Sequence, residues 1–337
     1  MAFLFVNDMP LGKLSLYNFI FPGRGRFPFG ETRESYSLSL FDLDAMFASH
    51  ILAGTEKASH EYRVLLIGDS SVWGTLLTPE QTLAGQLNAS ALSACGKSVR
   101  AYNLGYPTIS LTKDLMILDR ARHYQPDMVV WLTTLEAFPN DKQLTSPIVA
   151  NNSDGIQTLI TNYQLPLPVL GKPSQWEQTL VSQRRAIADL IRLQIYGALW
   201  ASTGIDQIYP ENYERAQTDL EASDDFHGLT SLNDALTFDV LNAGMSIVPN
   251  TILVNEPMLI SEGLNSDIRY NFFYPRWAYD EYRQLLAEHA AARNWRYIDL
   301  WDLVPASEFT NSAIHLTPAG EALLADKIAG AIQDGCK

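Results

Sequence analysis

The feature that most constrains this chain is an apolar run that stops abruptly at a turn, Val64-Leu65-Leu66-Ile67-Gly68-Asp69-Ser70. Four consecutive aliphatic residues bounded by turn formers predict a strand that is buried on both faces, as in parallel sheets. A helix start follows, because Thr78 and Gln81 form a capping box around Pro79. The loop after such a strand is where α/β proteins place functional residues. The stretch therefore predicts strand, loop and helix, with Ser70 at the carboxyl end of the strand.

A second motif lies near the end of the chain, where His315 stands two residues before another Thr-Pro helix start. Taken alone, Asp69 and Ser70 also fit an ordinary turn that caps the next helix. A serine after the first strand and a histidine after the last strand can, however, meet above one edge of a single sheet. The pair then has the composition of a nucleophile and its general base.

The segments between these motifs alternate in the way that parallel sheets require. Further strands are predicted at residues 98–104, 128–132, 251–254 and 296–300. Helical periodicity covers residues 111–124 and 278–293. This βαβ pattern predicts an α/β fold with a five-stranded parallel sheet and helices on both faces.

The 337 residues are divided by this pattern into an extension and one large domain. Residues 1–60 form the N-terminal extension, which we expect to pack on the core. Residues 61–337 form the α/β domain, in which residues 137–250 are an insertion after the third strand, placed to cap the site. Within the insertion, residues 175–201 are predicted to form a long helix whose apolar stripe faces the core.

Residues 21–30 of the extension combine turn formers, aromatic residues and two arginines. Two interpretations remain open for this segment. The first is a strap whose aromatic side chains pack on the domain. The second is a wall of the substrate site, where Arg24 or Arg26 binds an anionic group.

In these motifs the chain resembles the SGNH hydrolase superfamily, also called GDSL esterases and lipases, over roughly residues 62–332. The resemblance is carried by Gly68-Asp69-Ser70 with Gly74, by Asn103-Leu104-Gly105, and by the stretch from His315 to Gly320. It implies a three-layer, flavodoxin-like fold. It further implies that Ser70 is the nucleophile, that His315 is the general base, and that the backbone amides of Ser70 and Gly105 line the oxyanion hole.

The chain departs from the family pattern at two positions. The family's oxyanion Asn after the third strand is absent, and Thr134 is predicted to donate in its place, with Asn140-Asp141 as the alternative. The family's Asp three residues before the histidine is replaced by Ser312. Asn311 is predicted to orient His315 instead, since an amide holds an imidazole in some cysteine proteases. Asp299 and Asp302 are the alternatives.

Two further residues are predicted to contact substrate. Asn255 follows the fourth strand, and Arg276 lies in an unusually aromatic stretch at residues 269–277. The alternative is that this stretch only packs beneath the helix that follows it. No P-loop, dinucleotide fingerprint, HExxH or CxxC motif occurs, so we expect no cofactor and no metal. The net charge of -14 argues against nucleic-acid and anionic-membrane partners.

The two cysteines, Cys95 and Cys336, imply no disulfide framework and are compatible with a reducing compartment. The first six residues form too short an apolar run for a signal peptide or a membrane span. We therefore expect a cytoplasmic location, or an envelope or extracellular one if an upstream anchor has been removed. The sequence yields no prediction of oligomeric state.

The function that these observations predict is a cofactor-free serine esterase. Ser70 would attack the carbonyl of a small-molecule ester or an acylated glycan, with His315 as base, and form an acyl-enzyme. The alternatives are an O-acyltransferase or deacetylase that acts on envelope carbohydrate, and a binding module of the same fold that has lost turnover.

Overall fold

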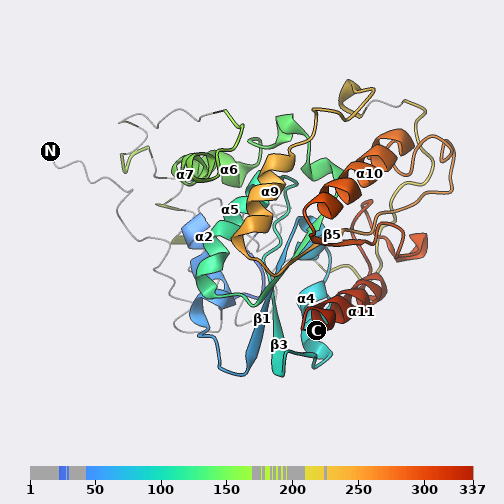
Figure 1. Ribbon diagram of the computed structural model, residues 1–337. Coiled ribbons are helices and arrows are strands. Elements are labelled where there is room, and N and C mark those ends of the chain that lie inside the picture. The colour runs from blue at the N-terminus through green and yellow to red at the C-terminus, as the bar shows by residue number, and fades with distance from the viewer. Residues whose placement is uncertain are drawn as a thin grey trace.

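The computed structural model describes residues 23–27, 29, 43–168, 209–223 and 226–336, together with scattered residues between 176 and 195. Its centre is a sheet in the order β2-β3-β1-β4-β5-β6 (Figure 1). All neighbouring strands are parallel except the pair of β2 and β3. The strands are β1 Glu61–Ile67, β2 Ser93–Ala94, β3 Lys97–Asn103, β4 Met128–Thr133, β5 Thr251–Asn255 and β6 Arg296–Asp299.

The mixed α/β class is confirmed, whereas the predicted number of strands was wrong, because the sheet has six strands within the described residues. The extra strand, β2, is two residues long and antiparallel to β3. The chain reverses between them at Cys95 and Gly96, which both have positive φ angles, 50° and 74°. A two-residue turn of this kind matches the twist of a hairpin. Such a short strand carries no periodic signal of its own in the sequence.

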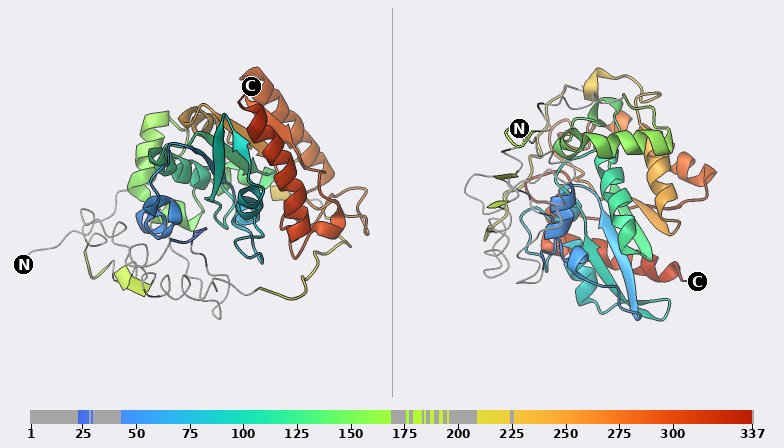
Figure 2. Two further views of the ribbon diagram at one scale, coloured as in Figure 1. Left: turned by 90° about the horizontal axis from the view of Figure 1, so that it is seen from below. Right: turned by 90° about the vertical axis from the view of Figure 1, so that its left-hand side faces the viewer.

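Helices cover both faces of the sheet, so the molecule has two hydrophobic cores. The side chains of β1 alternate between them: Leu65 and Ile67 face one core, and Val64 and Leu66 face the other. The red helix α11 lies on one side of the sheet and the green helices α5 and α7 lie on the other (Figure 2). The first core is covered by α2 Leu43–Ser49, α5 Leu111–Ala121, α7 Ser153–Tyr163, α9 Phe238–Ile247 and α10 Arg276–Ala292, and the second by α4 Leu83–Ala89 and α11 Pro318–Asp334.

The insertion between β4 and β5 includes α6 Pro147–Asn151, α7 and α9 among its described parts. The helix predicted for residues 175–201 falls largely outside the described residues. Its apolar side chains that are described do not support a stripe facing the core. The exposed fractions are 63% for Trp176, 56% for Ile191 and 60% for Ile195. Among the described residues, no helix combines the length and hydrophobicity needed to cross a membrane.

The described part of the N-terminal extension packs against the segment that follows β1. The Arg26 guanidinium lies 4.4 Å above the Trp73 ring and donates to the carbonyl oxygens of Gly74 and Leu77, both at 2.9 Å. Trp73 Nε1 in turn donates to the Phe27 carbonyl at 2.8 Å. Arg26 is 1% exposed, and its guanidinium binds backbone carbonyls of the core.

Cys95 and Cys336 form a disulfide, which corrects the expectation from the cysteine count. Cys95 lies in the turn between β2 and β3, and Cys336 follows the end of α11. Their Cα atoms are 5.1 Å apart although 241 residues separate them in the chain. The sequence does not show this pairing, because it depends on the last helix returning to the edge of the sheet that β2 and β3 form.

We predict that replacing both cysteines, by Cys95→Ser and Cys336→Ser, lowers the free energy of unfolding by about 2–5 kcal/mol. The disulfide closes a long loop, so its loss restores chain entropy to the unfolded state. Urea denaturation with and without a thiol reductant measures the effect. The reductant should destabilise the native chain and leave the double variant unchanged; equal stability of the oxidised and reduced native chain would refute the prediction.

Candidate active site

Ser70 is the first residue of α3 Ser70–Trp73, which begins directly after β1. Asp69 caps this short helix, since its side chain accepts a hydrogen bond from the Ser71 amide at 2.8 Å. Gly68 permits the tight turn, because a Cβ atom there would lie 2.6 Å from a Val72 methyl group. Helix α3 ends at Gly74 in a left-handed conformation with φ 85°. The turn therefore fixes Ser70 at the carboxyl edge of the sheet.

His315 lies in a closed turn between β6 and α11. The Thr310 amide donates to the His315 carbonyl at 2.8 Å, which ties the two ends of the turn together. Helix α11 then starts at Pro318, with Thr317 as its cap. The turn holds Asn311 and His315 on the same side, so that these two side chains face each other.

The structure brings Ser70, His315 and Asn311 together as a continuous relay. His315 Nε2 lies 2.8 Å from Ser70 Oγ, and His315 Nδ1 lies 2.9 Å from Asn311 Oδ1. An amide oxygen only accepts hydrogen bonds, so Nδ1 carries the ring proton and Nε2 accepts from the serine hydroxyl. The Thr310 hydroxyl lies 3.4 Å from Asn311 Oδ1 and donates toward it.

Burial lowers the pKa of His315 from 6.5 to about 4. Desolvation disfavours the charged imidazolium, and the ring's partner is a neutral amide rather than a carboxylate. The imidazole is therefore neutral at physiological pH, which is the form that accepts a proton from serine.

Two of the three predicted oxyanion donors already have hydrogen-bond partners in the structure. The Gly105 amide donates to Asn103 Oδ1 at 3.0 Å. Gly105 packs tightly on α3, because a Cβ atom there would lie 2.4 Å from the Trp73 amide nitrogen. Ser70 is at the first position of a helix, where the amide has no intrahelical acceptor. The Thr134 hydroxyl is buried and shares a hydrogen bond with the Tyr274 hydroxyl at 3.0 Å.

The alternatives for the missing residues also have other partners. Asn140 Nδ2 donates to the Asp234 carbonyl, and its oxygen accepts from the Thr237 hydroxyl. Asp299 accepts two hydrogen bonds from Arg283. Asn140 and Asp299 therefore form hydrogen bonds with residues other than Ser70 and His315.

The structure does not bring Asn255 and Arg276 to the relay. Asn255 is fully buried, and its oxygen accepts from the hydroxyls of Tyr279 and Tyr282 beneath α10. Arg276 lies 4.2 Å above the Tyr270 ring and donates to the Ser266 carbonyl at 2.7 Å. In this structure Asn255 supports the packing of α10, and Arg276 holds the preceding loop.

Three charged residues beneath Ser70 were missed. Glu256, which is 1% exposed, accepts a hydrogen bond from the Ser71 hydroxyl. Burial, together with the nearby charge of Asp69, raises the pKa of Glu256 well above its usual value. Lys113 and Asp114 form a buried ion pair at 2.5 Å in the first turn of α5. Two signals were available in the sequence: a Lys-Asp pair just before the apolar run at residues 115–118 of α5, and a Glu directly after a buried strand.

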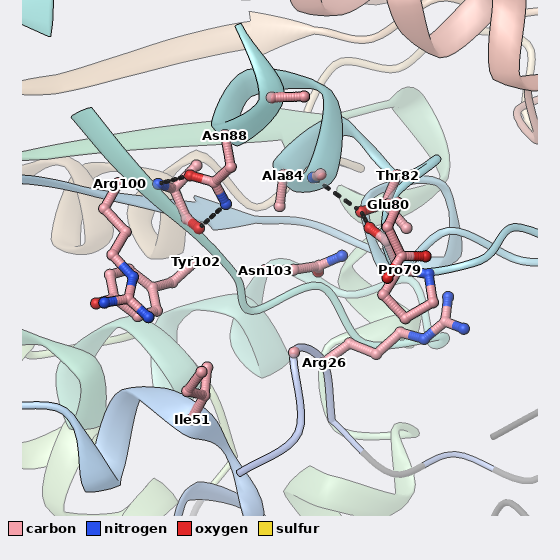
Figure 3. Close-up of a pocket in the computed structure, with 14 residues that line it drawn as sticks. Arg26, Ile51, Pro79, Glu80, Thr82, Ala84, Asn88, Arg100, Tyr102 and Asn103 are labelled. Atoms are coloured by element: carbon pink, nitrogen blue, oxygen red, sulfur yellow. Dashed lines mark hydrogen bonds between the residues drawn. The ribbon is translucent and has the colours of Figure 1, made fainter. Parts of the chain in front are cut away.

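A cavity of about 320 Å³ lies apart from the relay, between α4, β3 and the N-terminal strap (Figure 3). Arg26, Glu80 and Arg100 are among its lining residues, whereas Ser70 and His315 are not. Asn88 of α4 closes one side by two hydrogen bonds to the backbone of Ala101. Within the described part of the chain, no three His, Cys, Asp or Glu side chains are grouped so as to hold a metal ion.

We predict that His315 titrates near pH 4 and that Asn311→Asp raises its pKa. Burial sets the low value in the native chain, and a carboxylate beside Nδ1 would favour the charged ring. NMR titration of the imidazole measures both values in Ser70→Ala protein, where catalysis does not interfere. A native pKa near 6.5, or no upward shift in the Asp variant, would contradict the burial and the contact.

No protein-family model matches the chain, and no curated protein matches it. Solved structures that match include a lipase/acylhydrolase from Enterococcus faecalis, with 16% identity, a TM-score of 0.39, and coverage of 82% of this chain and 97% of that one. The aryl esterase of M. smegmatis matches with 13% identity, a TM-score of 0.38 and coverage of 81% and 98%. A carbohydrate acetylesterase family member from Sinorhizobium meliloti has 12% identity, a TM-score of 0.37 and coverage of 81% and 98%.

Proposed function

We propose that this protein is a serine ester hydrolase that needs no cofactor. The observation that carries the proposal is the unbroken relay from Ser70 Oγ through the His315 ring to Asn311 Oδ1, at 2.8 and 2.9 Å. These distances are those of a nucleophile, a general base and the group that orients the base. The low pKa of His315 leaves its ring neutral at physiological pH, and the neutral ring is the form that can act as the general base.

The reaction follows from this geometry in two halves. As Ser70 Oγ forms a bond to the ester carbonyl carbon, His315 Nε2 accepts the hydroxyl proton, and the carbonyl oxygen becomes an oxyanion. His315 then returns the proton to the departing alkoxide, which leaves as an alcohol and yields an acyl-enzyme on Ser70. In the second half, His315 deprotonates a water molecule that attacks the acyl carbon, and Ser70 regains its proton as the acid is released.

Asn311 keeps the Nδ1 proton in place, and so keeps Nε2 free to act as the base. Unlike a carboxylate, its amide carries no negative charge to stabilise the imidazolium that forms during the reaction. The relay is therefore competent but weaker than one with an acidic third member.

The backbone amides of Ser70 and Gly105 are the proposed oxyanion donors. Gly105 packs directly on the backbone of α3, so the two amides belong to adjoining turns. The Gly105 amide now donates to Asn103 Oδ1, and an oxyanion would share or replace that acceptor. Thr134 is not included, because its buried hydroxyl already shares a hydrogen bond with the Tyr274 hydroxyl.

We further propose an oxidising compartment in place of the cytoplasmic location expected from the cysteine count. The Cys95–Cys336 disulfide supports this location, since disulfides persist mainly outside the reducing cytosol. A small-molecule ester and an acylated glycan both remain compatible as substrates. The same acyl-enzyme serves transfer to a sugar hydroxyl, although hydrolysis requires only water.

We predict that a fluorophosphonate probe labels Ser70 and that the label depends on His315. An activated serine reacts with such probes, whereas an ordinary hydroxyl does not. Intact mass and peptide mapping of the native chain, Ser70→Ala and His315→Ala measure the label. Ser90→Ala, which removes an exposed hydroxyl at the end of α4, should label like the native chain. Well-folded native protein that stays unlabelled would instead favour a binding module without turnover.

We predict that Asn311→Ala lowers kcat for short activated esters by about ten- to a hundredfold, because part of the general-base contribution depends on an oriented ring. Asn311→Asp should raise kcat, since a carboxylate stabilises the imidazolium. The matched control is Ser312→Ala, one residue along the same turn, which should behave as the native chain. Unchanged kcat in both Asn311 variants would show that another group orients His315.

A further inference from the structure

Lys113 is a fully buried cation directly beneath the turn that carries Ser70. It lies in the first turn of α5, and its side chain has 0% exposure. Lys113 Nζ donates to the Gly68 carbonyl at 2.7 Å and the Tyr106 carbonyl at 3.2 Å. Its third partner is Asp114 Oδ1 at 2.5 Å. The ammonium group therefore has two carbonyl acceptors and one carboxylate counter-ion.

The two carbonyl groups belong to the two turns on which the proposed chemistry depends. Gly68 stands two residues before Ser70, and Tyr106 directly follows Gly105. The Tyr106 amide also donates to the Gly68 carbonyl at 3.0 Å. Lys113 thus completes a small bonded ring that joins the turn after β1 to the turn after β3.

The charge of Lys113 is balanced by carboxylates that are buried with it. Asp114 pairs with the ammonium and also accepts from Trp131 Nε1 at 3.1 Å, which anchors it to β4. Burial raises the pKa values of Asp69 and Asp114, and the charge of Lys113 opposes both shifts. A buried charge is tolerated only when it is paired and hydrogen-bonded, and this set meets that condition.

We infer that Lys113 is a positioning residue that sets the spacing between the Ser70 and Gly105 amides, and this inference rests on the proposed function. Oxyanion donors act only within about 2.7–3.1 Å of the developing charge, and loss of one donor lowers kcat by about 10²–10³. Lys113 bonds to the carbonyls of Gly68 and Tyr106, which lie close to the two amides in the chain. It therefore controls their spacing without touching substrate. Lys113 therefore acts through the backbone of the two turns.

The test is the double variant Lys113→Met/Asp114→Asn. It removes the bonds from Lys113 to the two carbonyls together with both charges, so that no unpaired carboxylate is left buried, as Lys113→Met alone would leave. The expected result is a loss of about a hundredfold or more in kcat with KM changed by less than about threefold, because the lost interaction belongs to the transition state. A folded double variant with native kcat would overturn the inference.

A matched control lies at the opposite end of β1. Glu61 and Arg63 form a buried ion pair at 2.6 Å, with side chains 6% and 2% exposed, and Arg63 also donates to the Tyr124 carbonyl. Glu61→Gln/Arg63→Met therefore removes a similar pair far from the catalytic edge. It should lower the unfolding temperature comparably and leave kcat unchanged. An equal loss of kcat in both double variants would mean that Lys113 contributes only stability.

Hydrogen exchange provides a readout that does not depend on turnover. Amides of residues 68–74 and 103–108 should exchange faster in the Lys113 double variant than in the Glu61/Arg63 control, because only the first frees both turns. A native chain that neither hydrolyses esters nor reacts with the probe would refute the proposed function. Unchanged exchange at both turns in the Lys113 double variant would overturn the present inference by itself.

Discussion

The parallel pairing of β1 with β3 on one side and β4 on the other is the constraint on which the site depends. Because β1 is buried along its whole length, the end of the strand cannot shift without disturbing both cores. The tight turn at Gly68 connects Ser70 to the end of this strand, so the position of Ser70 is fixed as well. His315 is brought to the same edge by the pairing of β6 with β5, so the sheet sets the distance between Ser70 and His315.

The parts of this arrangement that depend on local pattern were predictable. The apolar run before Ser70, the helix start at Thr317-Pro318 and the βαβ alternation each act within a few residues, and they led to the parallel strands and to a Ser70–His315 pair. The helix start predicted at Thr78-Pro79 was wrong, because α4 begins at Leu83 with Thr82 as its cap. Asn311 was also predictable, since it is four residues from His315 and shares its turn. The disulfide and the Lys113 ring join segments distant in the chain, and a single sequence carries no local trace of such contacts.

Asn255 shows a different limit of sequence analysis. It was selected because it stands where a strand ends, but side chains alternate between the faces of a sheet. Asn255 is on the same face as Leu253, which belongs to the core beneath α10, and so its amide meets tyrosines. One residue later, Glu256 reaches the Ser71 hydroxyl. Position along a strand was inferred correctly, whereas the direction of the side chain required the three-dimensional register.

The distance along the chain between Ser70 and His315, 245 residues, has a consequence for how the protein is made. A growing polypeptide presents its amino-terminal segments first, and domains complete their folding only when all their elements have emerged. The turn that carries Ser70 is therefore synthesised long before the turn that carries His315. During translation the proposed nucleophile has no proposed base beside it until the residues around His315 have emerged.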